Sequence, residues 1–206
     1  MMDSNTKPHF TGTRKKTYTL LINAALELFE QRAIPSVSEL AIHAGVSRAT
    51  AYRYFPTQSD LIDAIVSASL GPILTWKPSS ENTEERIIEL LDFAYPRMFQ
   101  HEGALRAALL VSLQQWAQGR SSEDKQEKKL VRGHRKEILS MVVEPLKRHF
   151  PPDTLENVIR SFSLIYGSEV FLVMKDIWHM DDAKVIEITK WMAKAIINQA
   201  YRDSEL

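Results

Sequence analysis

The amino-acid sequence predicts an all-α protein, with an N-terminal helix-turn-helix domain of three helices and a larger helical domain after it. Apolar residues recur at spacings of three and four along almost the whole chain of 206 residues, which is the pattern of amphipathic helices. Alternating, strand-like segments are absent, and the 7 Gly and 9 Pro lie mostly near the ends of the periodic segments. With 44% hydrophobic residues, the chain can bury a sizeable core.

The first predicted helix begins near Thr17 and presents one apolar face. Its members follow helical spacing and are Tyr18, Leu21, Ile22, Ala25, Leu28 and Phe29. The helix ends before Pro35, since a proline disfavours helical backbone in the residue that precedes it.

Two short helices follow, on either side of a tight turn. Ser36 and Glu39 form a Ser-x-x-Glu capping box, which predicts the start of a helix over residues 36–44. Gly45 permits the positive φ of a turn, and Ser47 can cap the next helix, over residues 47–55. This helix–turn–helix arrangement completes the three-helix unit.

The larger part of the chain consists of longer helical patterns. A cap at 57–60 opens a fourth helix, which we expect to break at Gly71-Pro72 before a linker at 77–83. Pro96 and Pro145 fall inside longer segments and should kink them. About nine helices are predicted in all, the last five at 84–100, 102–118, 125–150, 154–180 and 181–202. We place the domain boundary between residues 1–60 and 61–206.

The net charge of zero conceals an uneven distribution. The chain has 26 Lys plus Arg and 26 Asp plus Glu, a balance that taken alone argues against a polybasic nucleic-acid binder. Residues 10–58, however, contain six basic and three acidic residues, and residues 59–206 contain nineteen basic and twenty-two acidic ones. The N-terminal module is therefore basic, and neutrality of the whole does not exclude DNA.

Several classes of function are disfavoured. The chain has no Cys, which excludes disulfide frameworks, thiolate metal sites and cysteine nucleophiles. None of the HExxH, Gly-x-Ser-x-Gly, P-loop or GxGxxG patterns occurs, and none of the 6 His pairs with another at metal-ligand spacing on a helix. We therefore predict no enzyme, no metal and no cofactor. The absence of an apolar leader and of a long apolar segment predicts a soluble, cytoplasmic chain that does not enter a membrane.

The second short helix has the chemistry of a major-groove reader. Its outward face carries Arg48, Ala49, Tyr52 and Arg53, which combine guanidinium donors for guanine edges with a methyl group for thymine. The hydroxyls of Thr50, Tyr52 and Tyr54 suit phosphate oxygens.

Residues 40–55, LAIHAGVSRATAYRYF, resemble the DNA-binding domain of the TetR family of transcriptional regulators. The preceding basic segment and the first helix ending in Phe29 extend the resemblance over about the first 65 residues, a third of the chain. The resemblance implies a role for each matching position. Ser36, Ser47, Thr50, Tyr52 and Tyr54 would contact phosphates, Arg48, Ala49 and Arg53 would face base edges, and Arg14, Lys15 and Lys16 would flank them on the backbone.

Two positions depart from the family pattern. Gln58 stands where the family usually has a phosphate-binding lysine, so this contact would release no counterion. Ala33 stands where a Gly often ends the first helix, which affects a turn more than a function.

The C-terminal two thirds favour a dimer and a ligand pocket. Wide apolar faces on the last two helices predict a four-helix interface with a second subunit, and the family resemblance implies the same. The expected dimer residues are Phe162, Ile165, Glu169, Leu172, Ile188, Met192, Ala195 and Ile196. A small apolar ligand would be bound among Tyr95, Met98, Phe99, Leu109, Ser112, Leu113, Trp116, His134, Met141 and Tyr166.

These features together predict a homodimeric repressor that binds a palindromic double-stranded DNA operator and is released by a small apolar ligand. One alternative is a TetR-like DNA-binding protein whose larger domain binds a protein partner, which a small pocket and an exposed apolar patch would favour. A remote alternative is an uncharacterised helical enzyme, whose signature would be a polar cleft with convergent titratable groups.

Overall fold

In the computed structural model, residues 10–30, 34–119 and 134–204 are described, and they form helices without strands. This confirms the predicted all-α class. In chain order the elements are α1 (Gly12–Glu30), α2 (Val37–His43), α3 (Arg48–Tyr54), α4 (Gln58–Leu74), α5 (Thr83–Gln100), α6 (Glu102–Gly119), α7 (His134–Val142), the 3-10 helix η1 (Glu144–Arg148), α8 (Pro152–Ile165), α9 (Glu169–Phe171), the π-helix η2 (Leu172–Ile177) and α10 (Asp182–Ser204).

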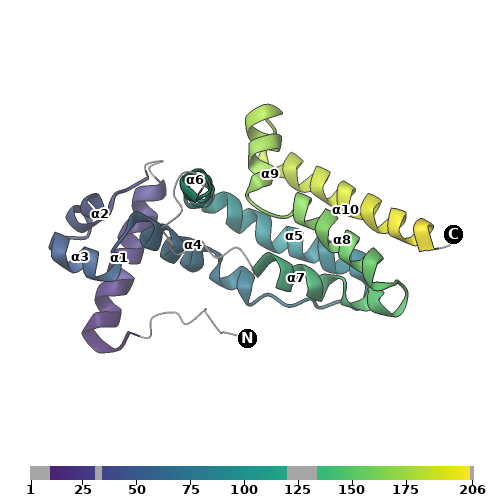
Figure 1. Ribbon diagram of the computed structural model, residues 1–206, viewed down its shortest axis with the longest axis horizontal. Helices are drawn as coiled ribbons and strands as arrows, with labels where there is room; N and C mark the ends of the chain where they lie inside the picture. The colour runs from purple at the N-terminus through teal and green to yellow at the C-terminus, as the bar shows by residue number, and fades with distance from the viewer. Residues whose placement is uncertain (1–9, 31–33, 120–133, 205–206) are drawn as a thin grey trace.

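Two hydrophobic cores divide the molecule. The first, called the N-terminal core, joins α1, α2, α3 and the start of α4 through residues that include Leu21, Leu40, Phe55 and Leu61. The second, called the main core, surrounds α5, which lies among α7, α8 and α10 (Figure 1). The cores lie at opposite ends of an elongated molecule, with α2 and α3 far from the C-terminus (Figure 1).

Helix α4 connects the two cores without a break. Its first half buries Leu61 and Ile65 in the N-terminal core, and Ile73 near its end is buried in the main core. The predicted break at Gly71-Pro72 is wrong, because both residues lie inside the last turns of α4. Close to this proline, the backbone carbonyl oxygen of Ser69 accepts a hydrogen bond from Arg97 Nε at 3.0 Å. The loop predicted at 77–83 is present and ends at the cap of α5.

The predicted helix at 125–150 ends earlier than expected. Residues 125–133 lie outside the described ranges, and within those ranges α7 covers His134–Val142. A 3-10 turn, η1, replaces the rest, because Pro145 has no N–H for an α-helical hydrogen bond. Pro96 has a milder effect, since α5 continues past it to Gln100.

The predicted helix at 154–180 is interrupted. Helix α8 ends at Ile165, and the chain turns through Gly167, which has a φ of 151°. The Arg135 side chain lies against this turn. It donates to the Ser163 carbonyl oxygen at 3.1 Å and forms a salt bridge with Glu169 at 2.5 Å. Residues on both sides of the break belong to the same core, so the helical spacing of apolar residues continues across it. The spacing therefore does not reveal the turn.

Replacing Gly167 with Ala should destabilise the protein. A Cβ at this position would clash with the Arg135 guanidinium, and the φ of 151° is one that L residues rarely adopt. We expect the free energy of unfolding to fall by about 1–3 kcal/mol, measured by denaturant titration. Gly71→Ala is the matched control, because nothing lies within 4 Å of a Cβ there. Within a helix that change should stabilise by up to about 1 kcal/mol. Equal effects at the two positions would contradict the strain argument.

Candidate nucleic-acid interface

Hydrogen bonds at the helix starts fix the geometry of α2, the turn and α3. Ser36 Oγ accepts from Glu39 N at 3.2 Å, and Glu39 Oε2 accepts from Ser36 N at 2.7 Å, so the predicted capping box is confirmed. These two hydrogen bonds hold the pKa of the exposed Glu39 carboxyl below its usual value. Ser47 Oγ accepts from Thr50 N at 3.1 Å and so caps α3. Gly45 has a φ of 65°, as the turn requires.

Helix α3 is held by a small contact and presents most of its surface to solvent. Ala51 is its only buried residue, and Arg48, Ala49, Tyr52 and Arg53 are exposed. The four residues predicted to form the outward face of the recognition helix are therefore all accessible to solvent. Thr50 is half-buried, with its hydroxyl 2.9 Å from Ser47 Oγ.

The basic residues of this region are available for an anionic partner. Arg14, Lys15 and Lys16 are exposed in the first turn and a half of α1, as are Arg48 and Arg53 on α3. Within the described ranges, none of these five pairs with a carboxylate. Arg14 and Arg53 lie near each other in the fold, because Tyr54 contacts both of them. The arrangement supplies uncompensated positive charge beside an exposed helix, which suits a phosphate backbone.

Two side chains expected at phosphates donate to backbone carbonyl oxygens of distant residues instead. The Tyr54 hydroxyl donates to the Arg14 carbonyl oxygen at 3.1 Å, from the end of α3 to the start of α1. Gln58 Nε2 donates to the Pro35 carbonyl oxygen at 3.2 Å. The Tyr52 hydroxyl is exposed and lies 3.4 Å from Ser38 Oγ. Sequence patterns show which side chains can donate a hydrogen bond, but the partner depends on the packing of α1 against α3.

The residues expected around a ligand are divided between two places. Tyr95 and Phe99 stack with ring centroids 5.3 Å apart in the main core, and Phe171, which the sequence did not single out, packs 5.4 Å from Phe99. Met98, Met141 and Tyr166 also belong to the main core or pack against it. Leu113 and Trp116 are instead exposed on α6. Of the remaining residues, Leu109 is buried and Ser112 and His134 are half-buried.

Tyr95 is held firmly in the main core. Its hydroxyl donates to the Ile165 carbonyl oxygen at 2.7 Å, which closes the end of α8. Burial raises the pKa of this phenol well above its usual value, so the group stays protonated and remains a donor. Its role in the described chain is thus to join α5 to α8.

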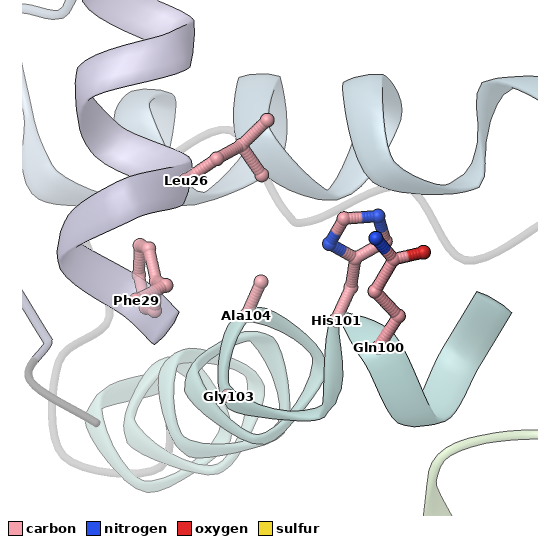
Figure 2. Close-up of a pocket in the computed structure, with 6 residues that line it drawn as sticks. All are labelled: Leu26, Phe29, Gln100, His101, Gly103 and Ala104. Carbon is pink, nitrogen blue, oxygen red and sulfur yellow. The ribbon is translucent and has the colours of Figure 1, made fainter. Parts of the chain in front are cut away.

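A small pocket lies between α1 and the turn that joins α5 to α6. Figure 2 shows Leu26 and Phe29 on the α1 side and His101 and Ala104 on the other. Gln100 and Gly103 complete the lining, and no residue of the expected ligand set takes part. A Cβ on Gly103 would lie 3.1 Å from the Phe29 carbonyl oxygen, so the two helices approach closely here.

The expected dimer residues include two that cannot lie on a surface. Phe162 and Ile165 are 0% and 2% exposed and belong to the main core, so their assignment is wrong. Exposed apolar residues on these helices are instead Leu164 on α8, at 80%, and Trp191 on α10, at 68%. Of the other expected residues, Leu172 and Ala195 are exposed, and Glu169, Ile188, Met192 and Ile196 are half-buried.

The residues that the structure describes give no sign of two other kinds of site. Within them, no three His, Cys, Asp or Glu side chains are grouped so that they could hold a metal ion. None of the described helices is both long enough and apolar enough to span a membrane.

Comparison with known proteins identifies the N-terminal domain. Residues 21–65 match the family model of bacterial regulatory proteins, tetR family. The fold is similar to a tetR-family transcriptional regulator from Streptomyces coelicolor, at 22% identity and a TM-score of 0.68, over 95% of this chain and 86% of that one. It is also similar to a TetR transcriptional regulator from Rhodococcus sp. RHA1, at 14% identity and a TM-score of 0.59, over 90% of this chain and 97% of that one. No curated protein matches the chain.

Removal of the α3 cap should weaken the domain measurably. Ser47→Ala leaves the Thr50 N–H without its 3.1 Å acceptor, and we expect a loss of about 1 kcal/mol in the free energy of unfolding. Thermal and denaturant unfolding measure the effect. Ser140→Ala, at an exposed position inside α7, is the control and should change stability by less than about 0.5 kcal/mol. A loss at Ser47 no larger than the control would show that the cap does not hold α3.

Proposed function

We propose that this chain is a DNA-binding transcriptional regulator of the TetR family and acts as a homodimeric repressor, because residues 21–65 match the model of that family. It binds a palindromic operator, and a small apolar molecule in the larger domain releases it. The observation that carries the proposal is the exposed face of α3, where Arg48, Ala49, Tyr52 and Arg53 all face solvent. Helix α2, which has the same length, buries Val37, Leu40 and Ala41, whereas α3 buries Ala51 alone.

The chemistry of α3 supports recognition in the major groove. Arg48 stands in the first turn of the helix, and the N-terminal residues of a recognition helix are the ones that approach base edges. A guanidinium can donate two hydrogen bonds to guanine O6 and N7, and the Ala49 methyl group suits thymine. Exposed Arg14, Lys15 and Lys16 would bind phosphates on either side and set the register of the helix.

Exposed apolar residues on α8 and α10 support a dimer. These helices pack side by side (Figure 1), and Leu164 and Trp191 expose large apolar side chains on them. Aromatic side chains such as Trp are enriched at the centres of protein interfaces. Two copies would present two recognition helices to half-sites about one helical turn or more apart, which explains a palindromic operator.

Packing between the domains supports control by a ligand. The small side chains of Ala104, Ala107, Ala108 and Val111 on α6 are buried in the N-terminal core. Helix α6 contacts both α1 and α4, so a displacement of α6 would move the whole DNA-binding unit. A ligand that favours the displaced arrangement would shift the population away from the spacing that fits the operator.

An ion network sets the position of α6 at its start. Lys175 Nζ lies 2.5 Å from Glu102 and 2.7 Å from Asp182, which joins α6 to η2 and α10. Arg106 adds bonds of 2.7 Å to Asp176. Although burial alone would raise the pKa of Glu102, hydrogen bonds from Lys175 and Arg106 hold it below its usual value, so it remains charged at neutral pH. Any ligand that disturbs this end of the main core would act on α6 directly.

The stacked rings of the main core support an apolar ligand. Phe99 and Phe171 lie next to Tyr95, close to the Lys175 network at the start of α6. A planar, mostly apolar molecule inserted among these rings would be stabilised by burial and would separate Phe99 from Phe171.

A second candidate function is control by a protein partner. The pocket between α1 and the α5–α6 turn is small, and Ile177 and Trp178 at the end of η2 expose large apolar surfaces. A partner that covers these residues would contact the segment carrying Lys175, and so reach α6 without entering the core.

Selection of operators from random duplex DNA by the purified full-length protein tests the central proposal. The expected result is enrichment of an inverted repeat, bound with one dimer per site. Repetition of the binding assay with a library of small metabolites tests release. Recovery of no preferred sequence would reject the proposed function, and enrichment without release by any small molecule would favour the protein partner.

Arg48 and Lys15 should have different roles in DNA binding. Arg48→Ala should cost about 1–3 kcal/mol on the selected operator and relax the preference at one base position in each half-site. Lys15→Ala should weaken binding to all duplexes alike and reduce the salt slope by about 0.9 per subunit, because one phosphate contact is lost. Titrations on operator and scrambled duplexes at several salt concentrations separate the two. An equal loss on all duplexes for Arg48→Ala would reject base contact by this residue.

Trp191→Ala should weaken the dimer. Loss of a central aromatic side chain typically costs about 2 kcal/mol or more at an interface, so the dimer dissociation constant should rise by about thirtyfold or more. Sedimentation equilibrium measures it. Trp178→Ala is the matched control, since Trp178 is as exposed as Trp191 but lies at the end of η2. If only the Trp178 variant dissociates, the interface lies at η2 and not on α8 and α10.

A further inference from the structure

An aromatic cluster joins the segment before α1 to the end of the recognition helix. The Phe10 ring lies 5.0 Å from Tyr18 on α1 and 5.2 Å from Tyr54 on α3, measured between ring centroids. Tyr18 also contacts Tyr54 at 6.2 Å and Phe55 at 5.8 Å. We call Phe10, Tyr18 and Tyr54 the aromatic clasp.

Phe10 extends the clasp beyond the packing that folds the domain. Tyr18 and Tyr54 lie at the edge of the N-terminal core, and Phe10 is not part of it. Phe10 is half-buried and precedes the first residue of α1. The Phe10 ring therefore adds contacts outside the core, which hold the start of α1 against the end of α3.

A hydrogen bond reinforces this connection and determines what Tyr54 can do. Its hydroxyl donates to the Arg14 carbonyl oxygen at 3.1 Å. A tyrosine hydroxyl has one proton, and a phosphate oxygen at neutral pH is an acceptor, so Tyr54 cannot make both bonds at once. While the clasp is closed, Tyr54 is not a donor to DNA.

The clasp also restricts the positions of two guanidinium groups. The Arg14 guanidinium lies 4.9 Å from the centroid of the Phe10 ring, and the Arg53 guanidinium lies 5.8 Å from that of Tyr54. Both are cation–π contacts, which restrict where a long side chain holds its charge. Arg14 is the start of the basic run Arg14, Lys15 and Lys16, and Arg53 lies on the outward face of α3.

We propose that Phe10 and Tyr54 are positioning residues for DNA binding, which hold the Arg14 guanidinium and the first turn of α1 beside α3 at the spacing of the phosphate backbone. The inference rests on the proposed function and deepens it, because it assigns the two residues a role that does not require them to touch DNA. Pre-organised charges bind more tightly than mobile ones, since less side-chain freedom is lost on binding.

The test compares Phe10→Ala, Phe10→Tyr and Tyr54→Phe with wild type in the full-length protein. On both operator and scrambled duplexes, Phe10→Ala and Tyr54→Phe should each bind roughly two- to fivefold more weakly per subunit. For Phe10→Ala the salt slope should also fall by up to about 0.9 per subunit, because the Arg14 guanidinium is no longer held beside a phosphate. Phe10→Tyr keeps the ring and should restore binding. Leu20→Ala, at an exposed apolar position of α1, is the matched control and should bind like wild type.

Two further measurements distinguish positioning from direct contact. If Tyr54 acts through the clasp, the double variant Phe10→Ala/Tyr54→Phe should be no weaker than the worse single variant, whereas a direct phosphate contact would give additive losses. Without DNA, hydrogen exchange of the backbone amides of residues 16–18 should be severalfold faster in both single variants, because the first turn of α1 is less well held.

The possible results reject different parts of the proposal. Wild-type protein that binds no duplex DNA rejects the proposed function. Wild-type binding with an unchanged affinity and salt slope in Phe10→Ala rejects the clasp as a positioning device, even if amide exchange accelerates. Additive losses in the double variant reject the positioning role of Tyr54 in favour of direct contact, and failure of Phe10→Tyr to restore binding rejects the role of the ring.

Discussion

Helix α6 belongs to the larger domain in sequence, but its small side chains are buried in the N-terminal core. Ala104, Ala107, Ala108 and Val111 pack there together with residues of α1 and α4. Small residues allow two helix backbones to approach closely, so this contact fixes the distance between the domains more tightly than long side chains would. Both the orientation of α3 and any effect of the larger domain on DNA binding depend on this contact.

Helix α3 and the start of α6 are held in place by different interactions. The recognition helix is held by caps and one buried alanine, which leaves its outward face free for an external partner. The start of α6 is held by charges that are partly buried and satisfied within the chain, through Glu102, Lys175 and Arg106. The first arrangement keeps charge available, and the second keeps charge paired. This difference is the one expected if α3 contacts DNA and α6 links the two domains, as proposed above.

Local signals in the sequence predicted the N-terminal domain well. The capping box at Ser36 and Glu39 and the cap at Ser47 depend on residues within one turn, and all of them are present in the structure. Features that depend on distant partners were not predictable. The turn at Gly167 depends on Arg135, thirty-two positions earlier, and the Tyr54 hydrogen bond depends on the carbonyl oxygen of Arg14, forty positions earlier. On α8, apolar residues lie on more than one side of the helix, so spacing could not distinguish the buried Phe162 from the exposed Leu164.

The close approach of Gly103 to Phe29 leaves little room for a side chain at position 103. The glycine lies at the start of α6, where its absent side chain lets the end of α1 come within van der Waals distance. An alanine at position 103 would require the end of α1 and the start of α6 to move apart by a few tenths of an ångström, so the contact between these helices depends on the absence of a side chain there.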